Sequence, residues 1–317
     1  MNSLSDLQRL LYKVSREYYE NQLTQNEIAK RLGLSRIKVS RLLKQARQEQ
    51  IVSISLTPPP GLLAELEEGI EKKYGMEEVR VVMCEDSSSQ NSIISQLAPS
   101  AVECLLRRIQ GREVIGVAMG KTMVSVVNRM PTVSLPDITI VQTNAGLGHI
   151  VTLEQSAELA RQMAGKLSAQ LRLLHAPGVA KDEEAADVFK SDPLIAETLS
   201  LAAQADIAIL SIGLLATSSA ALRSSALLTD SDINELTTQN AVGDIALRFF
   251  DANGRAVHTS LDARIIGLSY AQLQAIPCVI SVAGGDEKLD VIRAGLKSGI
   301  PNVLVTDQHT AEELLKD

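Results

Sequence analysis

The sequence predicts an α/β protein in which a small helical domain precedes a larger domain built on a parallel, doubly wound sheet. Pro58, Pro59 and Pro60 stand in a row, and three consecutive prolines continue neither a helix nor a central strand. Before them apolar residues recur at helical spacing, and after them short β-branched runs alternate with helical patterns. Such alternation is typical of parallel sheets covered by helices. We expect domains over 1–56 and 62–317, joined by a linker over 57–61.

The composition is that of a globular protein, and its charge is unevenly distributed. Of 317 residues, 45% are hydrophobic and 22% are charged, which is close to average usage. Residues 1–56 hold ten Lys or Arg and five Asp or Glu, a net charge of +5, whereas the whole chain carries −7 and the remainder therefore −12. A basic head on an acidic body indicates that only the head meets a polyanion.

The sequence also indicates the compartment. No apolar run reaches the roughly 18 residues of a membrane helix, and charges interrupt the apolar positions of the N-terminus, unlike those of a secretory signal. Cys84, Cys104 and Cys278 lie far apart, which fits a reducing environment better than a disulfide framework. We therefore expect a cytoplasmic protein with no membrane contact.

Three helices are expected before the prolines. The first carries one apolar stripe: Leu7, Leu10, Leu11, Val14 and Tyr18. A second begins at Thr24, which can form a reciprocal capping box with Glu27. Gly33 supplies a turn, and Ser35 can cap a third helix. The buried stripe of that helix is Val39, Leu42, Leu43 and Ala46.

The exposed residues near the start of the third helix suit DNA. They are Arg36, Ile37, Lys38, Ser40 and Arg41. This is the pattern of a helix-turn-helix, whose recognition helix turns its N-terminal residues toward the bases of the major groove. Arginine pairs with guanine, and isoleucine can touch a thymine methyl. Lys44, with Lys30 and Arg47, suits phosphates. The alternative is a basic three-helix bundle that binds no nucleic acid.

Residues 52–56, just before the prolines, alternate apolar and polar side chains and predict a short strand, as in a wing. The larger domain is expected to contain seven strands: Val79–Cys84, Glu113–Ala118, Ile138–Thr143, Leu171–His175, Ile207–Ile212, Val279–Ala283 and Asn302–Thr306. Between several of them we expect helices: Glu154–Ala169, Leu194–Ala203 and Lys288–Ser298.

One glycine-containing segment has the features of an anion site. Residues 116–122 follow an apolar strand and open a helix, and backbone amides at a helix N-terminus bind anions. Gly116 and Gly120 would let an oxyanion approach, and Lys121 and Thr122 would add donors. The segment is no Walker A loop, since Ile115 stands where the first glycine is needed. The alternative is a tight strand-to-helix turn.

Two stretches of the chain resemble a known family. LTQNEIAKRLGLSRIKVSRLLKQARQEQIV resembles the DNA-binding segment of the SorC family of bacterial sugar-responsive regulators. VAGGDEKLDVIRAGLKSGIPNVLVTDQHTAEELL resembles the end of that family's sugar-binding domain, and the resemblance runs nearly full length. It implies a body related in fold to sugar-phosphate isomerases and deaminases, control of a carbohydrate-utilisation operon by a phosphorylated sugar, and a tetrameric assembly.

The resemblance also implies a place for the phosphate. A second loop follows another expected strand and offers Thr143, Asn144, Gly146 and Gly148. In a doubly wound sheet such loops gather where the strands end, and the resemblance implies that both loops hold the phosphate. The sequence departs from the family pattern at Met119, Lys121 and Ala145. Ala145 would narrow the approach to the second loop.

Asp244 and Lys288 complete the expected effector site. Each follows a glycine-marked turn beside an apolar run. The resemblance implies that Asp244 binds ligand hydroxyls and that Lys288 contributes to the same pocket. The alternatives are an aspartate that caps a helix and a lysine that faces solvent.

No catalytic, metal or cofactor pattern emerges. The four histidines are scattered, without metal-ligand spacing, and no GxSxG motif is present. We expect a regulator that is not an enzyme; a sugar-phosphate isomerase or deaminase with a DNA-binding head is the main alternative. A DNA-binding protein whose body only oligomerises is the third possibility. Because one recognition helix reads only a few base pairs, a dimer or tetramer is expected.

Overall fold

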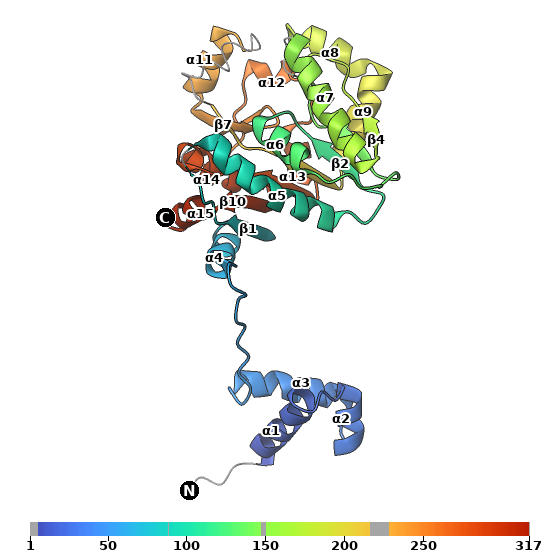
Figure 1. Ribbon diagram of the computed structural model, residues 1–317, viewed down its shortest axis with the longest axis vertical. Coiled ribbons are helices and arrows are strands. Elements are labelled where there is room, and N and C mark those ends of the chain that lie inside the picture. Colours follow the sequence, from blue (N-terminus) through green and yellow to red (C-terminus); the bar gives the residue numbers. More distant parts are fainter. Residues whose placement is uncertain (1–5, 88, 147–149, 216–227, 317) are drawn as a thin grey trace. The chain divides into compact units, whose positions relative to one another are not determined.

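Residues 6–87, 89–146, 150–215 and 228–316 are described by a computed structural model (Figure 1). The chain divides between Pro59 and Pro60 into two compact units. Among the described residues, no helix combines the length and hydropathy that a membrane span requires.

The first unit contains the expected three helices. They are α1 (Asp6–Tyr19), α2 (Gln25–Leu32) and α3 (Arg36–Gln48). The capping box of Thr24 and Glu27 is confirmed, and Gly33 ends α2 with a φ of 66°, a left-handed conformation that favours glycine. Ser35 accepts a hydrogen bond from the Lys38 amide and so caps α3. Local capping residues therefore set the helix boundaries of this unit.

The predicted apolar stripes form the core of the first unit. Its buried members are Leu11, Val14, Ile28, Ala29, Val39, Leu42, Leu43 and Ala46. The core begins at Leu11, so Leu7, one turn earlier, is 45% exposed and does not belong to it. Glu17 is buried and accepts hydrogen bonds from Arg31 and Asn21, each at 3.0 Å. This ion pair joins α1 to α2.

The strand predicted at residues 52–56 is wrong. The segment has no regular secondary structure, and Ile54 and Leu56 are 58% and 92% exposed. An alternating pattern produces a strand only where a second strand supplies hydrogen bonds and a core covers the apolar face. Among the described residues of this unit, no such partner strand is present.

The second unit is built on a seven-stranded sheet in which every neighbouring pair is parallel. The strand order is β1-β10-β9-β5-β2-β3-β4. The strands are β1 (Glu78–Val82), β2 (Val114–Val117), β3 (Thr139–Gln142), β4 (Gln170–Arg172), β5 (Ile207–Leu210), β9 (Cys278–Val282) and β10 (Val303–Asp307). All seven expected strands are present, with shifted ends, so the α/β fold class is confirmed.

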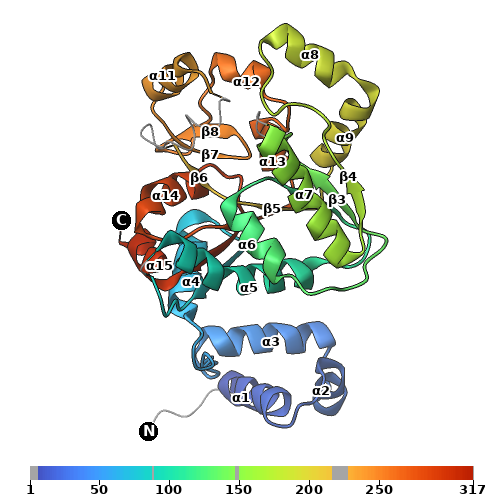
Figure 2. The same cartoon turned by 45° about the horizontal axis from the view of Figure 1, so that its top comes forward.

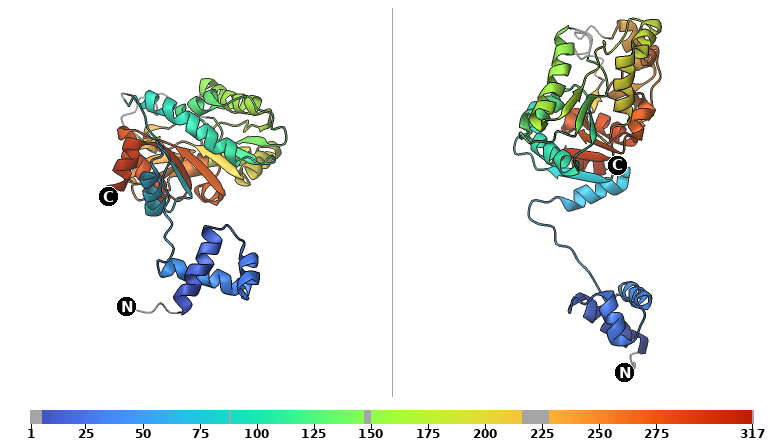
Figure 3. Two further views of the ribbon diagram at one scale, coloured as in Figure 1. Left: turned by 60° about the horizontal axis from the view of Figure 1, so that its bottom comes forward. Right: turned by 90° about the vertical axis from the view of Figure 1, so that its right-hand side faces the viewer.

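Helices cover both faces of this sheet (Figure 3). One face carries α5 (Gln90–Arg108), α6 (Lys121–Arg129) and α7 (Ile150–Leu167). The other carries α4 (Ala64–Tyr74), α9 (Pro193–Ala203), α13 (Tyr270–Ala275), α14 (Leu289–Lys297) and α15 (Gln308–Leu315). The five inner strands are apolar on both sides because each contributes to two helix-covered cores, whereas β4, at one edge, contributes only Leu171.

A small antiparallel sheet lies beyond the carboxyl edge of the large one (Figure 2). It consists of β6 (Gly213–Leu214), β7 (Ala241–Ile245) and β8 (Arg248–Asp251), in the order β6-β7-β8. Beside it lie α11 (Asp230–Thr238) and α12 (Ser260–Arg264), and α8 (Glu183–Ser191) packs against α9 and α12. Since β5 ends at Leu210 and β6 begins at Gly213, the chain passes directly from one sheet to the other.

The sequence did not predict this small sheet. β7 contains Gly243 and Asp244, two residue types that strands disfavour. The β7–β8 turn places Ala246 and Leu247 at φ values of 51° and 66°, where Asn and Gly are usual. Neither the strand nor its turn therefore carries an ordinary sequence signal.

Candidate functional site

The expected DNA-contacting side chains form an exposed surface on α3. Arg36, Ile37, Lys38, Ser40, Arg41 and Lys44 are all exposed. Ile37 is 67% exposed and is therefore accessible to a thymine methyl group. Within the described part of the chain, no hydrogen bond or ion pair engages the side chains of the four cations among them. These charges are free to meet phosphates and base edges.

Two other arginines of this unit serve its fold. Arg31 pairs with the buried Glu17. Arg47, which we assigned to phosphates, donates from Nε to the Tyr19 hydroxyl at 2.8 Å and lies 5.9 Å from the centroid of the same ring. The cations without internal partners are therefore concentrated toward the start of α3, the end that enters the major groove in helix-turn-helix proteins.

The larger domain has its topological switch point between β2 and β5. From β2 the chain proceeds to β3 and β4 on one side and later returns to β5 on the other. Ligands of doubly wound proteins bind in the crevice beyond the carboxyl ends of such strands. Gly120, which follows β2, and Ser211, which follows β5, meet there: a Cβ on Gly120 would lie 2.8 Å from the Ser211 hydroxyl.

The first predicted loop is shorter than the sequence suggested. Gly116 lies inside β2, where a Cβ would stand 2.8 Å from the Thr143 methyl group and 3.4 Å from the Ala208 Cβ. Its small size therefore allows neighbouring strands to pack. Gly120 is the N-cap of α6, and no side chain among the described residues caps that helix. Lys121 is exposed beside these first amides, whereas Thr122 is buried.

The second predicted loop is more enclosed than expected. Thr143 and Asn144 are buried, and Asn144 donates from its amide to the Ala145 carbonyl at 3.1 Å. The Thr143 carbonyl accepts from the Leu268 amide at 2.8 Å. The Gly146 carbonyl accepts from the Gly178 amide, also at 2.8 Å. Gly148 lies outside the described residues. The structure thus holds this loop from two sides by backbone hydrogen bonds.

Asp244 and Lys288 are brought together at the end of β5. Lys288 ends a 3-10 helix (Asp286–Lys288) and donates from Nζ to the Ile212 carbonyl at 2.8 Å. Asp244 lies in β7 and pairs with Gly213 of β6. A Cβ added to Gly213 would lie 2.2 Å from the Asp244 carboxylate. Asp244 Oδ2 accepts from the Leu247 amide at 3.0 Å and so stabilises the β7–β8 turn.

The charges of this region interact. Burial raises the pKa of Asp244, an effect opposed by the Leu247 hydrogen bond and the positive charge of Lys288. Burial lowers the pKa of Lys288; Asp244 opposes this shift, and Lys121 reinforces it. Lys288 is therefore close enough to both Asp244 and Lys121 for its charge to interact with each of them. A ligand with both hydroxyl and anionic groups would find matching partners here.

The glycine pair in the C-terminal motif has a structural role. Gly285 has a φ of 92°, and its amide donates to Asp307 Oδ2 and Thr310 Oγ1, both at 2.8 Å. A Cβ on Gly284 would lie 2.2 Å from the same Asp307 oxygen. Asp307 also caps α15. Sequence reasoning overlooked Asp307, although its position between a strand and a helix is typical of an N-cap.

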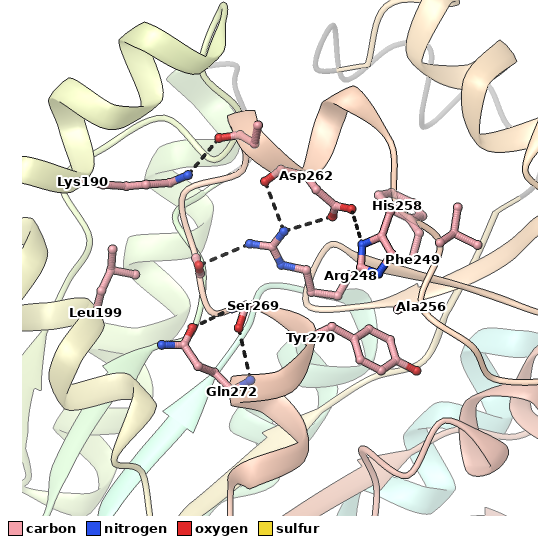
Figure 4. A pocket seen from close by; sticks show the side chains of 13 residues that line it. Lys190, Leu199, Arg248, Phe249, Ala256, His258, Asp262, Ser269, Tyr270 and Gln272 are labelled. Carbon is pink, nitrogen blue, oxygen red and sulfur yellow. Dashed lines mark hydrogen bonds and ion pairs between the residues drawn. The ribbon is translucent and has the colours of Figure 1, made fainter.

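A cavity of about 520 Å³ lies apart from the predicted residues (Figure 4). Lys190, Arg248, His258 and Asp262 contribute charged or titratable groups to its lining. The Arg248 side chain is buried beneath backbone carbonyls. Arg248 was not predicted from the sequence, because it directly precedes the apolar residues Phe249 and Phe250, which the sequence pattern assigns to the core. Among the described residues, no cluster of His, Cys, Asp or Glu could hold a metal ion.

Comparisons with known proteins agree with this architecture. Residues 59–316 match the family described as "Putative sugar-binding domain", and residues 1–49 match "Sigma-70, region 4". The chain is 30% identical to the deoxyribonucleoside regulator of Bacillus subtilis, over 98% of each protein. It is also 30% identical to the transcriptional regulator LsrR of Escherichia coli K12, over 94% of this chain and 92% of the relative.

Solved structures show the same relationship. The full-length sorbitol operon regulator SorC from Klebsiella pneumoniae is 26% identical, with a TM-score of 0.72 over 98% of this chain and all of the other. A DeoR family regulator from Listeria monocytogenes is 29% identical, with a TM-score of 0.72 over 79% of this chain and 98% of the other. The chain belongs to the SorC family of transcriptional regulators, which join a DNA-binding helix-turn-helix to a sugar-binding domain.

Proposed function

We propose that a phosphorylated sugar binds at the carboxyl edge of the parallel sheet and changes the affinity of this regulator for operator DNA. The observation that carries the proposal is the uncapped start of α6 with the exposed Lys121 beside it, together with Lys288, whose charge interacts with both Lys121 and Asp244. Helix amides and ammonium groups suit a phosphate. A carboxylate suits sugar hydroxyls.

The names of two relatives support a carbohydrate effector. One is called a deoxyribonucleoside regulator and another a sorbitol operon regulator. We extend this class of ligand to the present chain and place its phosphate against Gly120, Lys121 and Thr122. Thr143, Asn144, Gly146 and Gly148 stay in the proposal as the wall beside that phosphate. The burial of Thr143 and Asn144 favours backbone or water-mediated contacts over direct side-chain contacts.

The proposed regulator works as an oligomer in the cytoplasm, where a bacterial operator is found. One α3 reads a short half-site, so two or four copies are needed for a specific operator. Coupling requires the sugar phosphate to favour one arrangement of these copies, because a ligand shifts an equilibrium only by its differential affinity for the two states.

The alternative is a sugar-phosphate isomerase or deaminase. The raised pKa of Asp244 is the observation in its favour, since general acid–base catalysis uses carboxylates tuned toward neutrality. Asp244 already stabilises the Leu247 turn, and Lys288 already binds the Ile212 carbonyl. These positions favour a receptor without catalytic activity, and the likeness to named regulators supports the same choice.

A ligand screen tests the proposal. Thermal unfolding of the purified protein is measured with phosphorylated sugars and with the same sugars lacking phosphate. A ligand at 100 times its dissociation constant stabilises the folded state by about 2.7 kcal/mol. We expect a phosphorylated sugar alone to stabilise the protein and to change operator affinity in a fluorescence anisotropy titration. Turnover of that sugar, abolished by Asp244→Asn, would instead support the enzyme.

A further inference from the structure

The cavity in Figure 4 is lined by residues of α8, α9, β8, α12 and α13 and of the loops between them. Lys190 reaches into it from α8 and Arg248 from β8, on opposite walls. Asp262 belongs to α12 and Gln272 to α13. Its volume, about 520 Å³, lies in the ordinary range for small-molecule sites.

The positive charge of the cavity exceeds its negative charge. Arg248 donates to Asp262 Oδ1 at 3.1 Å, and the other oxygen of Asp262 lies 3.4 Å from His258. Lys190 has no carboxylate within ion-pair distance among the described residues; its Nζ donates to the Ala263 carbonyl at 2.8 Å. Burial and the nearby Arg248 lower the pKa of Lys190, and the negative charges of Asp187 and Glu183 on the same helix oppose this shift. One half-buried ammonium of the cavity lining is thus left without an ion-pair partner among the described residues.

Lys190 and Gln272 also supply the cavity with hydrogen-bond donors that have no partner among the described residues. An ammonium group has three N–H bonds, of which Lys190 uses one for Ala263. Gln272 accepts from the Ser269 amide through Oε1 at 2.8 Å, and its NH₂ group makes no hydrogen bond within the described part of the chain. A site with spare donors and an unbalanced cation suits the oxygens of an anion.

We propose that this cavity binds a small anionic metabolite through a phosphate or carboxylate group, held by Lys190, Gln272 and the Arg248 side of the cavity. The site is separate from the carboxyl-edge site of the sugar phosphate. The proposal rests on the cavity and its charges, and it holds whether or not the proposed sugar phosphate is the correct effector.

The two sites share a wall. Arg248 donates from Nε to the Leu268 carbonyl at 2.6 Å, and the Leu268 amide donates to the Thr143 carbonyl at 2.8 Å. Gly267 lines the cavity and pairs with Asn144 on its other side. An anion that moves Arg248 would therefore act on the loop that follows β3. This connection makes the cavity suited to a second effector that modulates the first.

Calorimetric titration of the full-length protein tests the site, with inorganic phosphate and citrate as probes. Phosphate represents phosphorylated metabolites and citrate represents carboxylic acids; binding of either supports the proposal, and the tighter probe identifies the class. Lys190→Gln should weaken binding about tenfold or more, the usual loss for a hydrogen bond to a charged group. Lys181→Gln, which removes an exposed lysine close in sequence, is the matched control and should bind like the parent.

A second variant guards against a folding defect. Gln272→Glu keeps the capping interaction with Ser269, because glutamate serves equally well at this position of a capping box. It replaces the donor with a negative charge and should also weaken anion binding about tenfold or more. Lys121→Gln, which removes a cation of the proposed sugar-phosphate site, identifies any probe that binds at the start of α6 instead.

Three results would overturn the proposal. The first is a parent protein that binds neither probe at millimolar concentration. The second is unchanged affinity in both Lys190→Gln and Gln272→Glu. The third is loss of probe binding in Lys121→Gln with retention in Lys190→Gln, which would assign the anion to the start of α6.

Discussion

Asp244 and Lys288, 44 positions apart in the sequence, bracket the same short piece of backbone. Lys288 binds the Ile212 carbonyl, and Asp244 packs against Gly213, the next residue. Gly213 is required there, because a Cβ would lie 2.2 Å from the Asp244 carboxylate. The end of β5 is thus the point at which a lysine from one turn and an aspartate from a hairpin converge.

Neutralising either residue should impair ligand binding. Asp244→Asn and Lys288→Met preserve side-chain size and remove one charge-assisted hydrogen bond, which is worth about 1.5–3 kcal/mol. We expect a phosphorylated sugar to bind about tenfold more weakly or worse, measured by calorimetry, while operator affinity without ligand is unchanged. Asp137→Asn, at an exposed aspartate, is the control. Normal ligand response in both variants would move the site elsewhere.

The pKa of Asp244 predicts a pH-dependent stability difference. Its folded-state pKa is raised, so the stability that its neutral form provides is present below the unfolded value of 3.8 and is lost as pH rises through the raised value. Asp244→Asn cannot ionise, so its free energy of unfolding relative to the parent should increase across that window. Urea unfolding of both proteins from pH 4 to pH 8 measures this difference. A difference independent of pH would contradict the raised pKa.

Gly120 should be needed for ligand approach as well as for packing. Gly120→Val should abolish the response to sugar phosphate without affecting operator binding, because a side chain would cover the first amides of α6. A Cβ at this position would also meet the Ser211 hydroxyl at 2.8 Å. The double variant Gly120→Ala/Ser211→Ala removes that clash. If the double variant regains the parent's affinity for ligand, Gly120 serves packing alone.

Arg41 and Lys44 should have different effects on DNA binding. Arg41→Ala should cost about 1–3 kcal/mol at one operator position and relax specificity there. Lys44→Ala should weaken binding to all sequences and reduce the salt dependence by about one ion. Fluorescence anisotropy with operator and random DNA, at several salt concentrations, separates the two effects. Arg129→Ala, in the larger domain, is the control; equal behaviour of Arg41→Ala on both DNAs would disprove base recognition.

Two glycine-to-alanine changes should have opposite effects on stability. Gly285→Ala forces a side chain into a φ of 92° and toward Gln90, at a cost of about 1–3 kcal/mol. Gly165→Ala meets no atom within 4 Å in α7 and should stabilise the protein by about 0.5–1 kcal/mol. Denaturant unfolding measures both. A Gly285→Ala protein as stable as the parent would show that Asp307 does not fix this turn.

The predictable parts of the fold carried local signals. Thr24, Gly33 and Ser35 marked the helix ends of the first unit because capping depends on neighbouring residues. The inner strands of the large sheet were detectable because both of their faces are buried, so their sequences are nearly continuously apolar. Hydrophobic pattern alone failed at residues 52–56, where no partner strand supports the alternation.

The less predictable parts depend on distant segments. Thr143 and Asn144 were expected to face a ligand, but Gly267 and Leu268, more than 120 positions later, cover them. The cation pair of Lys190 and Arg248 likewise comes from separate elements. Asp244 and Lys288 were identified individually, and only the fold shows that they contact neighbouring residues, Gly213 and Ile212. Sequence patterns report neighbours along the chain, and binding sites join residues across it.

The self-contained core of residues 11–46 has an evolutionary consequence. Every buried apolar side chain of that core comes from α1, α2 and α3, and the unit ends at Pro59, before the larger domain begins. The residues that would select the operator therefore lie in one unit with its own core, which recombination can exchange as a single segment. Recombination at the prolines would give an existing metabolite sensor a new set of genes without rebuilding either hydrophobic core.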